Sequence, residues 1–213
     1  MPSSSQWVAF LVASALFIQV PGPSLLFTIG RALTVGRRDA LLSVVGNGVG
    51  VTAQAAAVGV GLGAVAAQSV AVYSAIKLVG AVYVVWLGVQ AIRHRADARL
   101  ALAGALTARP GSSRRSLRTG LVVGLTNPKT MVFFAAFLPQ FVNPASGHSG
   151  VWIVVLGAVF GAMAICSDSL WALGASRARD WFARRPQRLD RLGLAGGVMM
   201  IGLGTTLAVS ERA

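Results

Sequence analysis

Long apolar segments separated by short polar connections constrain the fold of this chain more than any other feature. Six of them are long enough to cross a bilayer as helices, which takes about 20 residues. They run over residues 6–30, 41–66, 70–92, 119–142, 151–174 and 192–209. Only 12% of the residues are charged, against about 25% in soluble domains. The pattern therefore predicts an all-α membrane protein with six transmembrane helices.

Basic residues are concentrated in every second connection. Sixteen of the 19 lysines and arginines lie in residues 31–40, 93–118 and 175–191, whereas 67–69 and 143–150 contain none. Because positively charged loops stay in the cytoplasm, this alternation predicts that both termini lie outside. The basic residues of these connections also explain the net charge of +13. Nucleic acid is therefore not expected as a partner. Contact of the basic loops with anionic lipid headgroups is expected as a by-product of this topology.

Two of the apolar segments are interrupted by proline. Pro21–Pro23 lies in the first segment and Asn127–Lys129 lies in the fourth. Proline cannot donate to the helical ladder and clashes one turn back, so each helix is expected to break and to leave backbone groups that need a partner. Lys129 would also cost about 2.5–3.5 kcal/mol at the centre of a bilayer. These features favour helices that line a polar site over helices that only anchor the chain.

The two breaks occupy corresponding places in the chain. Residues 93–118 separate two groups of three segments, and each group begins with a broken segment. An odd number of spans per group gives the groups opposite orientations in the membrane. The sequence therefore predicts a single transporter domain over residues 1–213, in which 6–92 and 119–209 form an inverted 3+3 repeat with a midplane site between the broken helices. Proline kinks with a purely structural role are the alternative.

Residues in and beside the breaks are the candidates for binding a substrate. The helix that restarts after Pro23 directs its amide end, which carries partial positive charge, at the gap and so suits a carboxylate. Asn47 and Gln54 in the second segment either hydrogen-bond across helices or line a pathway. The predicted substrate-binding residues are Pro21, Gly22, Pro23, Ser24, Asn47, Asn127, Pro128 and Lys129.

Asp168 is the only acidic residue within a predicted span. An ionisable residue inside a membrane indicates a functional site, and the side chain of Lys129 is long enough to bridge the difference in depth. If alternating access changed their pairing, Asp168 would take up and release a proton, so we expect it to couple protons to transport. A static buried ion pair, or an aspartate that reaches interfacial water, is the alternative.

Patterns typical of enzymes and metal sites are missing from the sequence. His94 and His148 lie in connections, and no Ser/His/Asp or paired-carboxylate arrangement falls within the spans, so we expect no enzyme, no cofactor and no metal ion. The single cysteine, Cys166, excludes an intrachain disulfide and is expected to be a small buried residue. It also argues against a membrane redox protein, because electron relay needs a cysteine pair.

Glycines recur at four-residue spacing within the spans. The pairs are Gly46/Gly50, Gly59/Gly63, Gly120/Gly124 and Gly157/Gly161. Glycine at this spacing lets two helices approach backbone to backbone, so we expect close helix packing. A structural scaffold packed by glycine is a further alternative to a transporter, and the paired breaks argue against it.

Three blocks of residues resemble the LysE/RhtB family, the lysine exporter and homoserine/threonine resistance proteins of bacteria. The blocks are Pro21–Ser24, Ile76–Gly88 and Gly124–Phe141, and with the number and spacing of the spans the resemblance covers nearly the whole chain. It implies a protein of the bacterial inner membrane that exports amino acids, driven by proton movement into the cell. Ser24 stands where the family commonly has asparagine, which weakens the case for a side-chain contact there.

The residues and the resemblance together predict a secondary transporter that exports amino acids or close derivatives by proton antiport. The substrate carboxylate would meet the helix ends at Pro21–Ser24 and Asn127–Lys129, with positive charge from Lys129. Efflux of a cation or another small metabolite on the same fold is the alternative, disfavoured because few carboxylates lie in the spans. Nothing in the sequence selects one amino acid, and a homo-oligomer is left open.

Overall fold

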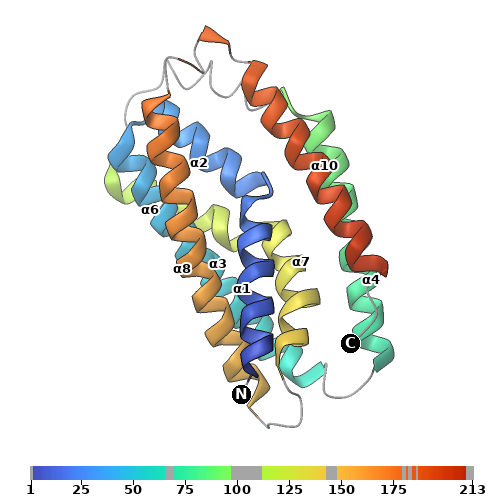
Figure 1. Ribbon diagram of the computed structural model, residues 1–213. Helices are drawn as coiled ribbons and strands as arrows, with labels where there is room; N and C mark the ends of the chain where they lie inside the picture. The colour runs from blue at the N-terminus through green and yellow to red at the C-terminus, as the bar shows by residue number, and fades with distance from the viewer. Residues whose placement is uncertain are drawn as a thin grey trace.

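Every regular element that the computed structural model describes is a helix, which confirms the predicted all-α class (Figure 1). The structure describes residues 2–65, 70–96, 112–142, 148–178, 181, 184–185 and 187–209. Its elements are α1 (Ser4–Gln19), α2 (Pro23–Thr34), α3 (Arg37–Val65), α4 (Val70–Arg93), α6 (Ser113–Leu125), α7 (Pro128–Phe137), the 3-10 helix η1 (Leu138–Phe141), α8 (Ser149–Arg177) and α10 (Gln187–Val209). Most of the predicted connection at 93–118 lies outside the described residues.

Local signals in the sequence set several helix ends. Ser3 and Gln6 form a reciprocal capping box at the start of α1, which satisfies two backbone donors that the first turn leaves over. The Ser112 side chain accepts a hydrogen bond from the amide of Arg115 at the start of α6. Gly36, at φ +88°, forms the tight turn between α2 and α3. Glycine adopts this left-handed conformation without the steric cost that a Cβ would bring.

Both proline-containing segments are bent helix pairs, as the sequence predicts. α1 and α2 meet at 53°, and α6 meets the stretch from Pro128 to Phe141 at 46°. Pro23 begins α2 and Pro128 begins α7. At the first position of a helix the missing N–H of proline costs no helical hydrogen bond. The prolines therefore start the second helix of each pair and do not distort its interior.

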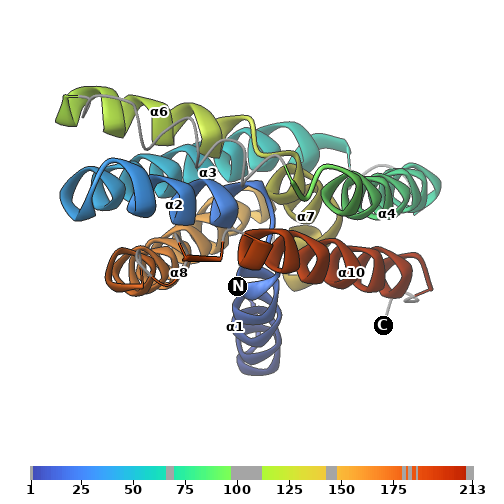
Figure 2. The same ribbon diagram turned by 90° about the horizontal axis from the view of Figure 1, so that it is seen from above.

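The helices form two groups that meet at the breaks. α3 packs against α2, α6 and α8 in the first group, and α4 packs along α10 in the second (Figures 1 and 2). The second group reaches the first where α4 contacts α7 and where Gly196 of α10 lies against Pro21.

Glycines allow the closest of these helix contacts. A methyl group on Gly120 or Gly124 of α6 would collide with the backbone of α3 at Ser43 or Asn47, and one on Gly161 of α8 would collide with the Thr52 side chain. The predicted close packing is thus confirmed at these positions. The surroundings of Gly63 lie outside the described part.

The outer surface of the bundle is apolar. Large apolar side chains are exposed on helices all around it, among them Val8, Leu16, Val49, Val82, Val122, Leu170 and Val198. A soluble monomer rarely exposes so much apolar surface, whereas hydrocarbon requires it. Arg37–Gly59 and Ser149–Arg177 are long and apolar enough to cross a membrane, and each bent pair also qualifies if it is one span. Among the described residues this criterion gives two to four spans, so the six predicted from the sequence stay a prediction.

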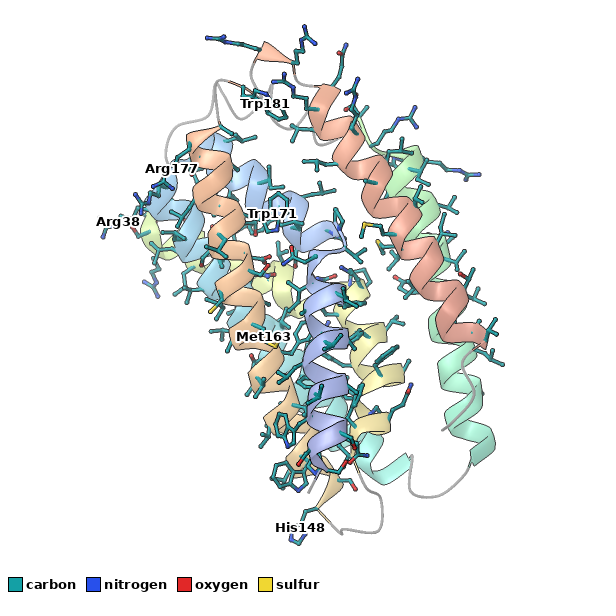
Figure 3. The ribbon with its side chains drawn as sticks, viewed as in Figure 1. Arg38, His148, Met163, Trp171, Arg177 and Trp181 are labelled. Atoms are coloured by element: carbon teal, nitrogen blue, oxygen red, sulfur yellow. The ribbon has the colours of Figure 1, made fainter. Side chains whose placement is uncertain are left out.

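Charged connections gather at one end of the bundle. Arg38 and Arg177 lie at this end, and His148 lies at the opposite end (Figure 3). The N-terminus lies at the His148 end (Figure 1). The arrangement agrees with the alternation of basic and uncharged connections along the sequence.

Candidate functional site

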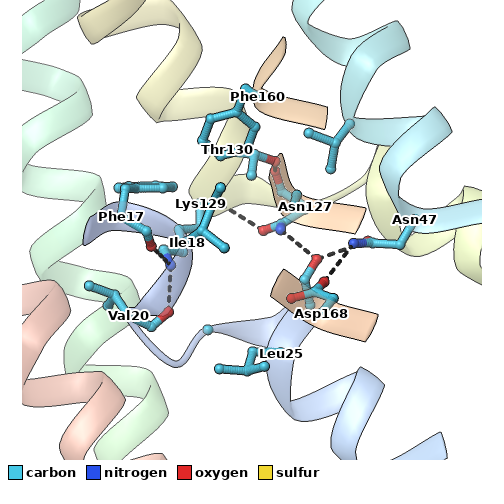
Figure 4. Close-up of a pocket in the computed structure, with 14 residues that line it drawn as sticks. Phe17, Ile18, Val20, Leu25, Asn47, Asn127, Lys129, Thr130, Phe160 and Asp168 are labelled. Atoms are coloured by element: carbon cyan, nitrogen blue, oxygen red, sulfur yellow. Dashed lines mark hydrogen bonds between the residues drawn. The ribbon is translucent and has the colours of Figure 1, made fainter. Parts of the chain in front are cut away.

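The two breaks lie against each other in the interior of the bundle. α1 ends at Gln19 and α2 begins at Pro23, while α6 ends at Leu125 and α7 begins at Pro128. Residues from both breaks line one small cavity, closed on its other sides by α3 and α8 (Figure 4). The predicted meeting of the two broken helices is therefore present in the structure.

Lys129 crosses from one break to the other. Its side chain is only 5% exposed, and Nζ donates to the carbonyl oxygens of Phe17 at 2.8 Å and Val20 at 2.6 Å. The same ammonium lies 4.3 Å from the centre of the Phe17 ring, a geometry of cation–π attraction. A buried charge is tolerated only with such partners, so Lys129 acts as the cap of the C-terminal end of α1.

The absence of a side chain at Gly22 leaves the space that the side chain of Lys129 occupies. A methyl group at this position would lie 2.8 Å from Cδ of Lys129, closer than two carbon atoms can approach without displacement. Gly22 is also the N-cap residue of α2, where no side chain supplies a capping hydrogen bond. The first amides of α2, at Ser24 and Leu25, therefore receive no side-chain cap, and both residues line the cavity.

A chain of side-chain hydrogen bonds connects the second break to Asp168. Asn127 donates from Nδ2 to Oγ of Ser24 at 2.9 Å, and Ser24 donates to Oδ1 of Asn47 at 2.9 Å. Asn47 donates in turn from Nδ2 to Oδ2 of Asp168 at 3.4 Å. The Oδ1 of Asn127 accepts from the Lys129 amide at 3.1 Å. One polar path thus runs through α2, α3, the α6–α7 break and α8.

Gln54 and Thr130 support the second break from behind. Gln54 donates from Nε2 to the carbonyls of Leu125 and Asn127, each at 3.1 Å. Its Oε1 accepts from the hydroxyl of Thr130 at 2.6 Å. Leu125 is the last residue of α6, so Gln54 satisfies a carbonyl that the end of this helix leaves over. The Asn127 carbonyl accepts from the Met131 amide as well. Of the two roles considered for Gln54 in the sequence, hydrogen bonding across helices is the one found.

Lys129 and Asp168 line the same cavity but are bonded to different partners. The Lys129 ammonium is held by backbone carbonyls, and the Asp168 carboxylate, in a side chain only 4% exposed, accepts from Asn47. The cavity thus contains one cationic and one carboxylate side chain in opposite walls (Figure 4). The static ion pair considered as an alternative for Asp168 is not the arrangement in this structure.

The predicted site residues divide into two groups. Gly22, Ser24, Asn47, Asn127, Lys129 and Asp168 line the cavity. Pro21, Pro23 and Pro128 are not among the residues that line it: Pro21 is buried against Gly196, and Pro23 is exposed. The prolines shape the site by ending helices, and neighbouring residues supply the groups that face the cavity.

The cavity has a volume of about 30 Å³. One water molecule needs roughly 10–15 Å³ measured in this way, whereas pockets for small organic ligands are about 300–1,000 Å³. The cavity in this conformation is therefore too small for an amino acid. The helices around it must move apart before such a molecule can be bound.

Phenylalanine side chains fill the bundle on the side of the cavity that faces the His148 end. Phe17 stacks on Phe133 with centroids 4.1 Å apart, and Phe160 lies 5.3 Å from Phe133. Phe134 and Phe141 continue the same cluster outward. Aromatic pairs add about 0.5–1.5 kcal/mol each beyond their buried area, so this side is firmly closed. Sequence reasoning missed the cluster, because phenylalanine is ordinary in an apolar span.

Two further features correct or extend the sequence interpretation. Cys166 is exposed, so the prediction that it is buried is wrong: its position on α8 turns it toward the outer surface. Arg31 of α2 donates to Ser43 of α3 at 3.1 Å and to Ser116 of α6 at 2.6 Å. Sequence reasoning treated Arg31 only as a topological charge, and it also ties three helices together.

No group of three His, Cys, Asp or Glu side chains that could hold a metal ion occurs in the described ranges.

Comparisons with known proteins match nearly the whole chain. A family model described as LysE type translocator matches residues 15–211. A homoserine/homoserine lactone efflux protein of Salmonella typhimurium is 30% identical over 215 residues, which cover 97% of this chain and 98% of that protein. A leucine efflux protein of Klebsiella pneumoniae is 25% identical over 213 residues, covering 96% and 95%. An uncharacterized membrane protein of Vibrio cholerae is 33% identical over 205 residues, covering 96% and 97%. No solved structure matches the chain.

Proposed function

The chain belongs to the LysE type translocator family, and from this premise we propose that it exports amino acids from the cytoplasm in exchange for protons. Membership makes it a membrane transporter and not an enzyme. Its relatives include proteins named for efflux of homoserine and of leucine, which supports amino acids as the substrate class.

The position of Lys129 is the observation that carries this proposal. Its ammonium is buried between two broken helices and is bonded to the carbonyls of Phe17 and Val20. A carboxylate is a stronger partner for an ammonium than a neutral carbonyl, because both groups are charged. The substrate carboxylate would therefore compete with the end of α1 for Lys129.

The beginning of α2 supplies the other half of the carboxylate site. The amides of Ser24 and Leu25 have no capping side chain, and both residues line the cavity. A helix N-terminus with unpaired amides stabilises an anion. Lys129 from one break and these amides from the other would hold the same carboxylate, which explains why both helices are broken.

Asp168 is suited to carry the proton. It lies across the cavity from Lys129 and is connected through Asn47 and Ser24 to the residues at both breaks. When the substrate enters, its ammonium would meet the Asp168 carboxylate and displace a proton from it. When the substrate leaves, the carboxylate would take up a proton from outside. Binding of substrate and proton would then exclude each other, as antiport requires.

The packing pattern supports an inverted repeat of six spans. In such a repeat α1–α2 would correspond to α6–α7, α3 to α8, and α4 to α10. The contacts agree: α3 packs on α8, α4 packs on α10, α6 contacts α3 as α1 contacts α8, and α7 contacts α3 as α2 contacts α8. Alternating access would proceed by rocking these halves about the central cavity. With the arginine-rich end in the cytoplasm of a bacterium, the phenylalanine cluster lies on the outer side of the cavity. It would close the cavity toward the outside of the inner membrane.

Efflux from preloaded cells tests the proposal. Cells that express the protein and cells that do not are loaded with a labelled amino-acid mixture, and loss of each amino acid is followed before and after the proton gradient is collapsed. We expect faster loss of one or a few amino acids, abolished by the uncoupler. If cells with and without the protein lose every amino acid at the same rate, the proposal is wrong. If the faster loss persists with the uncoupler, protons do not drive export.

A further inference from the structure

A row of polar side chains on α2 leads from the central cavity toward the arginine-rich end of the bundle. Ser24, Thr28 and Arg31 lie three or four residues apart, so they share one face of this helix. On α3, Asn47 is bonded to Ser24 and Ser43 is bonded to Arg31. At about 1.5 Å per residue, Arg31 lies about 10 Å along α2 from Ser24. These polar contacts therefore connect the proposed substrate cavity with the end that the proposed topology places in the cytoplasm.

Arg31 is a charged side chain whose hydrogen-bond partners in the described chain are neutral hydroxyls. Its Nε donates to Oγ of Ser43 at 3.1 Å, and its Nη2 donates to Oγ of Ser116 in α6 at 2.6 Å. Both serines are fully buried, and Arg31 is partly buried. A guanidinium has five N–H donors and bonds most strongly to a carboxylate, through two parallel hydrogen bonds. A carboxylate would therefore be a stronger partner for Arg31 than the two hydroxyls.

Two buried oxygens near Arg31 have no hydrogen-bond partner within the part of the chain that the structure describes. They are Oγ1 of Thr28, in a fully buried side chain, and Oδ1 of Asp39. Asp39 lies in the first turn of α3 and interacts electrostatically with Arg31, and its carbonyl accepts from Ser43 at 2.8 Å. A buried polar atom left unpaired costs about 1–3 kcal/mol. An ammonium group would supply the partner that the Asp39 carboxylate lacks.

The helix α2 is better able to move than the two helices it is bonded to. A methyl group on Gly120 of α6 would collide with the backbone of α3, so α3 and α6 behave as one rigid unit. The side chains of Arg31 and Ser24 bond α2 to that unit. Gly22 precedes α2, and Gly36, at φ +88°, follows it. Glycine allows the backbone rotations that a hinge needs, so α2 can swing once its side-chain bonds are released.

We infer that Arg31 and Asp39 form an entry site, at which a free amino acid arriving from the cytoplasm binds with its carboxylate on Arg31 and its ammonium on Asp39. The carboxylate replaces Ser43 and Ser116 on the guanidinium and so releases α2. The inference rests on the proposed function and names the substrate class of the entry site, molecules that carry both charges of an amino acid. Each charge gains a counter-charge as it loses water, which offsets the cost of desolvation. The site binds groups that all α-amino acids share, so selection of the side chain belongs to the central cavity.

Opening of the cavity follows from this exchange of partners. A ligand shifts an equilibrium between two conformations only by its differential affinity for them. The carboxylate takes over donors that Ser43 and Ser116 occupy in the closed conformation, so it binds more tightly when α2 has moved. Ser24 and Leu25 of α2 line the central cavity, and movement of α2 therefore enlarges the cavity toward the cytoplasm. The amino acid then moves along α2 into the enlarged cavity.

Distances between two spin labels test the movement of α2. Gly30→Cys on α2 and Arg118→Cys on α6 carry the labels in a Cys166→Ser background, because Cys166 is exposed and would also react. A side chain at Gly30 meets open space, and Arg118 is exposed. The purified protein in lipid nanodiscs is measured by double electron–electron resonance. We expect leucine, homoserine, threonine and lysine each to add a longer distance. Leucinamide, which has no carboxylate, and the oxo acid of leucine, which has no ammonium, should leave the distances unchanged.

The same labels in a K129M background separate the entry site from the central cavity. Methionine removes the charge proposed to bind the carboxylate in the cavity and leaves Arg31 intact. We expect the amino acids still to add the longer distance, although export is lost. If they do so only when Lys129 is present, the central cavity opens α2 and the inference is wrong. A longer distance with leucinamide or the oxo acid would overturn the assigned charge contacts.

Failure of the entry site and failure of the proposed function give different results. Distances that no amino acid changes, in a protein that exports at least one of them, overturn the entry site and leave the proposed function intact. Absence of export of any amino acid by the wild type is the separate failure of the proposed function.

Transport kinetics give a second test that does not need the labels. R31K keeps the positive charge but cannot make two parallel hydrogen bonds to a carboxylate, and R38K makes the same change on an exposed arginine of α3. Uptake into inside-out vesicles, which expose the cytoplasmic face, gives the KM for cytoplasmic substrate. We expect R31K to raise this KM roughly threefold to tenfold, the effect of one hydrogen bond, and R38K to leave it unchanged. A lower maximal rate of R31K at an unchanged KM would give Arg31 a purely structural role and contradict the inference.

Discussion

The ammonium of Lys129 in α7 is bonded to the carbonyl of Phe17 in α1, with 2.8 Å between Nζ and the oxygen. The two residues are 112 positions apart in the chain, and each belongs to one of the two broken helix pairs. The ring of Phe17 also stacks on Phe133. A single contact therefore connects the proposed carboxylate site with the aromatic cluster that closes one side of the bundle.

Replacing Lys129 with methionine tests the proposed carboxylate partner. The change keeps the unbranched side chain as far as Cε and removes the charged Nζ, so the carbonyls of Phe17 and Val20 lose the ammonium donor. We expect export to fall about tenfold or more, because a hydrogen bond to a charged group contributes about 1.5–3 kcal/mol.

Labelled amino-acid efflux from cells measures this effect. Arg114→Met is the control, since Arg114 is exposed at the start of α6 and takes no part in the site. Full export by Lys129→Met would rule out the role assigned to the ammonium.

Adding a methyl group at Gly22 tests the position of Lys129 without changing its charge. The new carbon would lie 2.8 Å from Cδ of Lys129, so the lysine must move from its carbonyl partners. We expect Gly22→Ala to raise the KM for export by roughly tenfold, since about 1.4 kcal/mol of lost interaction has that effect.

Gly30→Ala is the matched control for Gly22→Ala. Gly30 lies on the same helix, and a methyl group there meets nothing within 4 Å. Concentration dependence of efflux gives KM for both variants. Indistinguishable KM values would show that the room beside Gly22 is irrelevant to transport.

Asp168→Asn tests the proton step. The amide keeps the shape of the carboxylate and can still bond to Asn47, but it cannot take up a proton. We expect exchange of labelled for unlabelled substrate across the membrane to persist, while export against a substrate gradient is lost, because proton entry no longer drives it. Measuring both in the same vesicles separates the two activities. Normal proton-driven export by the variant would exclude Asp168 as the carrier.

Gly120→Ala tests the contact that sets α6 against α3. Its methyl group would collide with the backbone of Ser43, and neither backbone can yield locally. We expect a loss of about 1–3 kcal/mol of stability, the usual cost of overpacking, seen as a lower unfolding temperature of the purified protein. Gly202→Ala, whose methyl group meets nothing within 4 Å, should unfold at the wild-type temperature. Equal unfolding temperatures of Gly120→Ala and the wild type would show that the close approach at Gly120 does not stabilise the packing of α6 on α3.

The helices and their breaks could be predicted from the sequence because their causes are local. Proline at Pro23 and Pro128 ends one helix and starts the next whatever surrounds it, and apolar length alone marks the long helices. The need of the Phe17 carbonyl for a partner was also predictable, since Pro21 removes the amide that would have bonded it. The structure adds Val20 as the second carbonyl.

The partners within the site could not be predicted, because they depend on how distant helices meet. The sequence left open whether Lys129 pairs with Asp168, and the groups bonded to its ammonium are the carbonyls at the end of α1. Gln19 and Trp171 are far apart in the chain, and only packing of α1 on α8 makes them neighbours. The exposure of Cys166 is likewise a matter of which face α8 turns outward.

Transport by the purified protein in liposomes tests the central claim most directly. Liposomes loaded with labelled leucine, homoserine, threonine and lysine are placed in an acidic or a neutral medium, with wild type or Lys129→Met in the membrane. The account predicts efflux of at least one amino acid through the wild type, faster into the acidic medium, and loss of that efflux in Lys129→Met. Efflux of none of them, or equal efflux through both proteins, would contradict it.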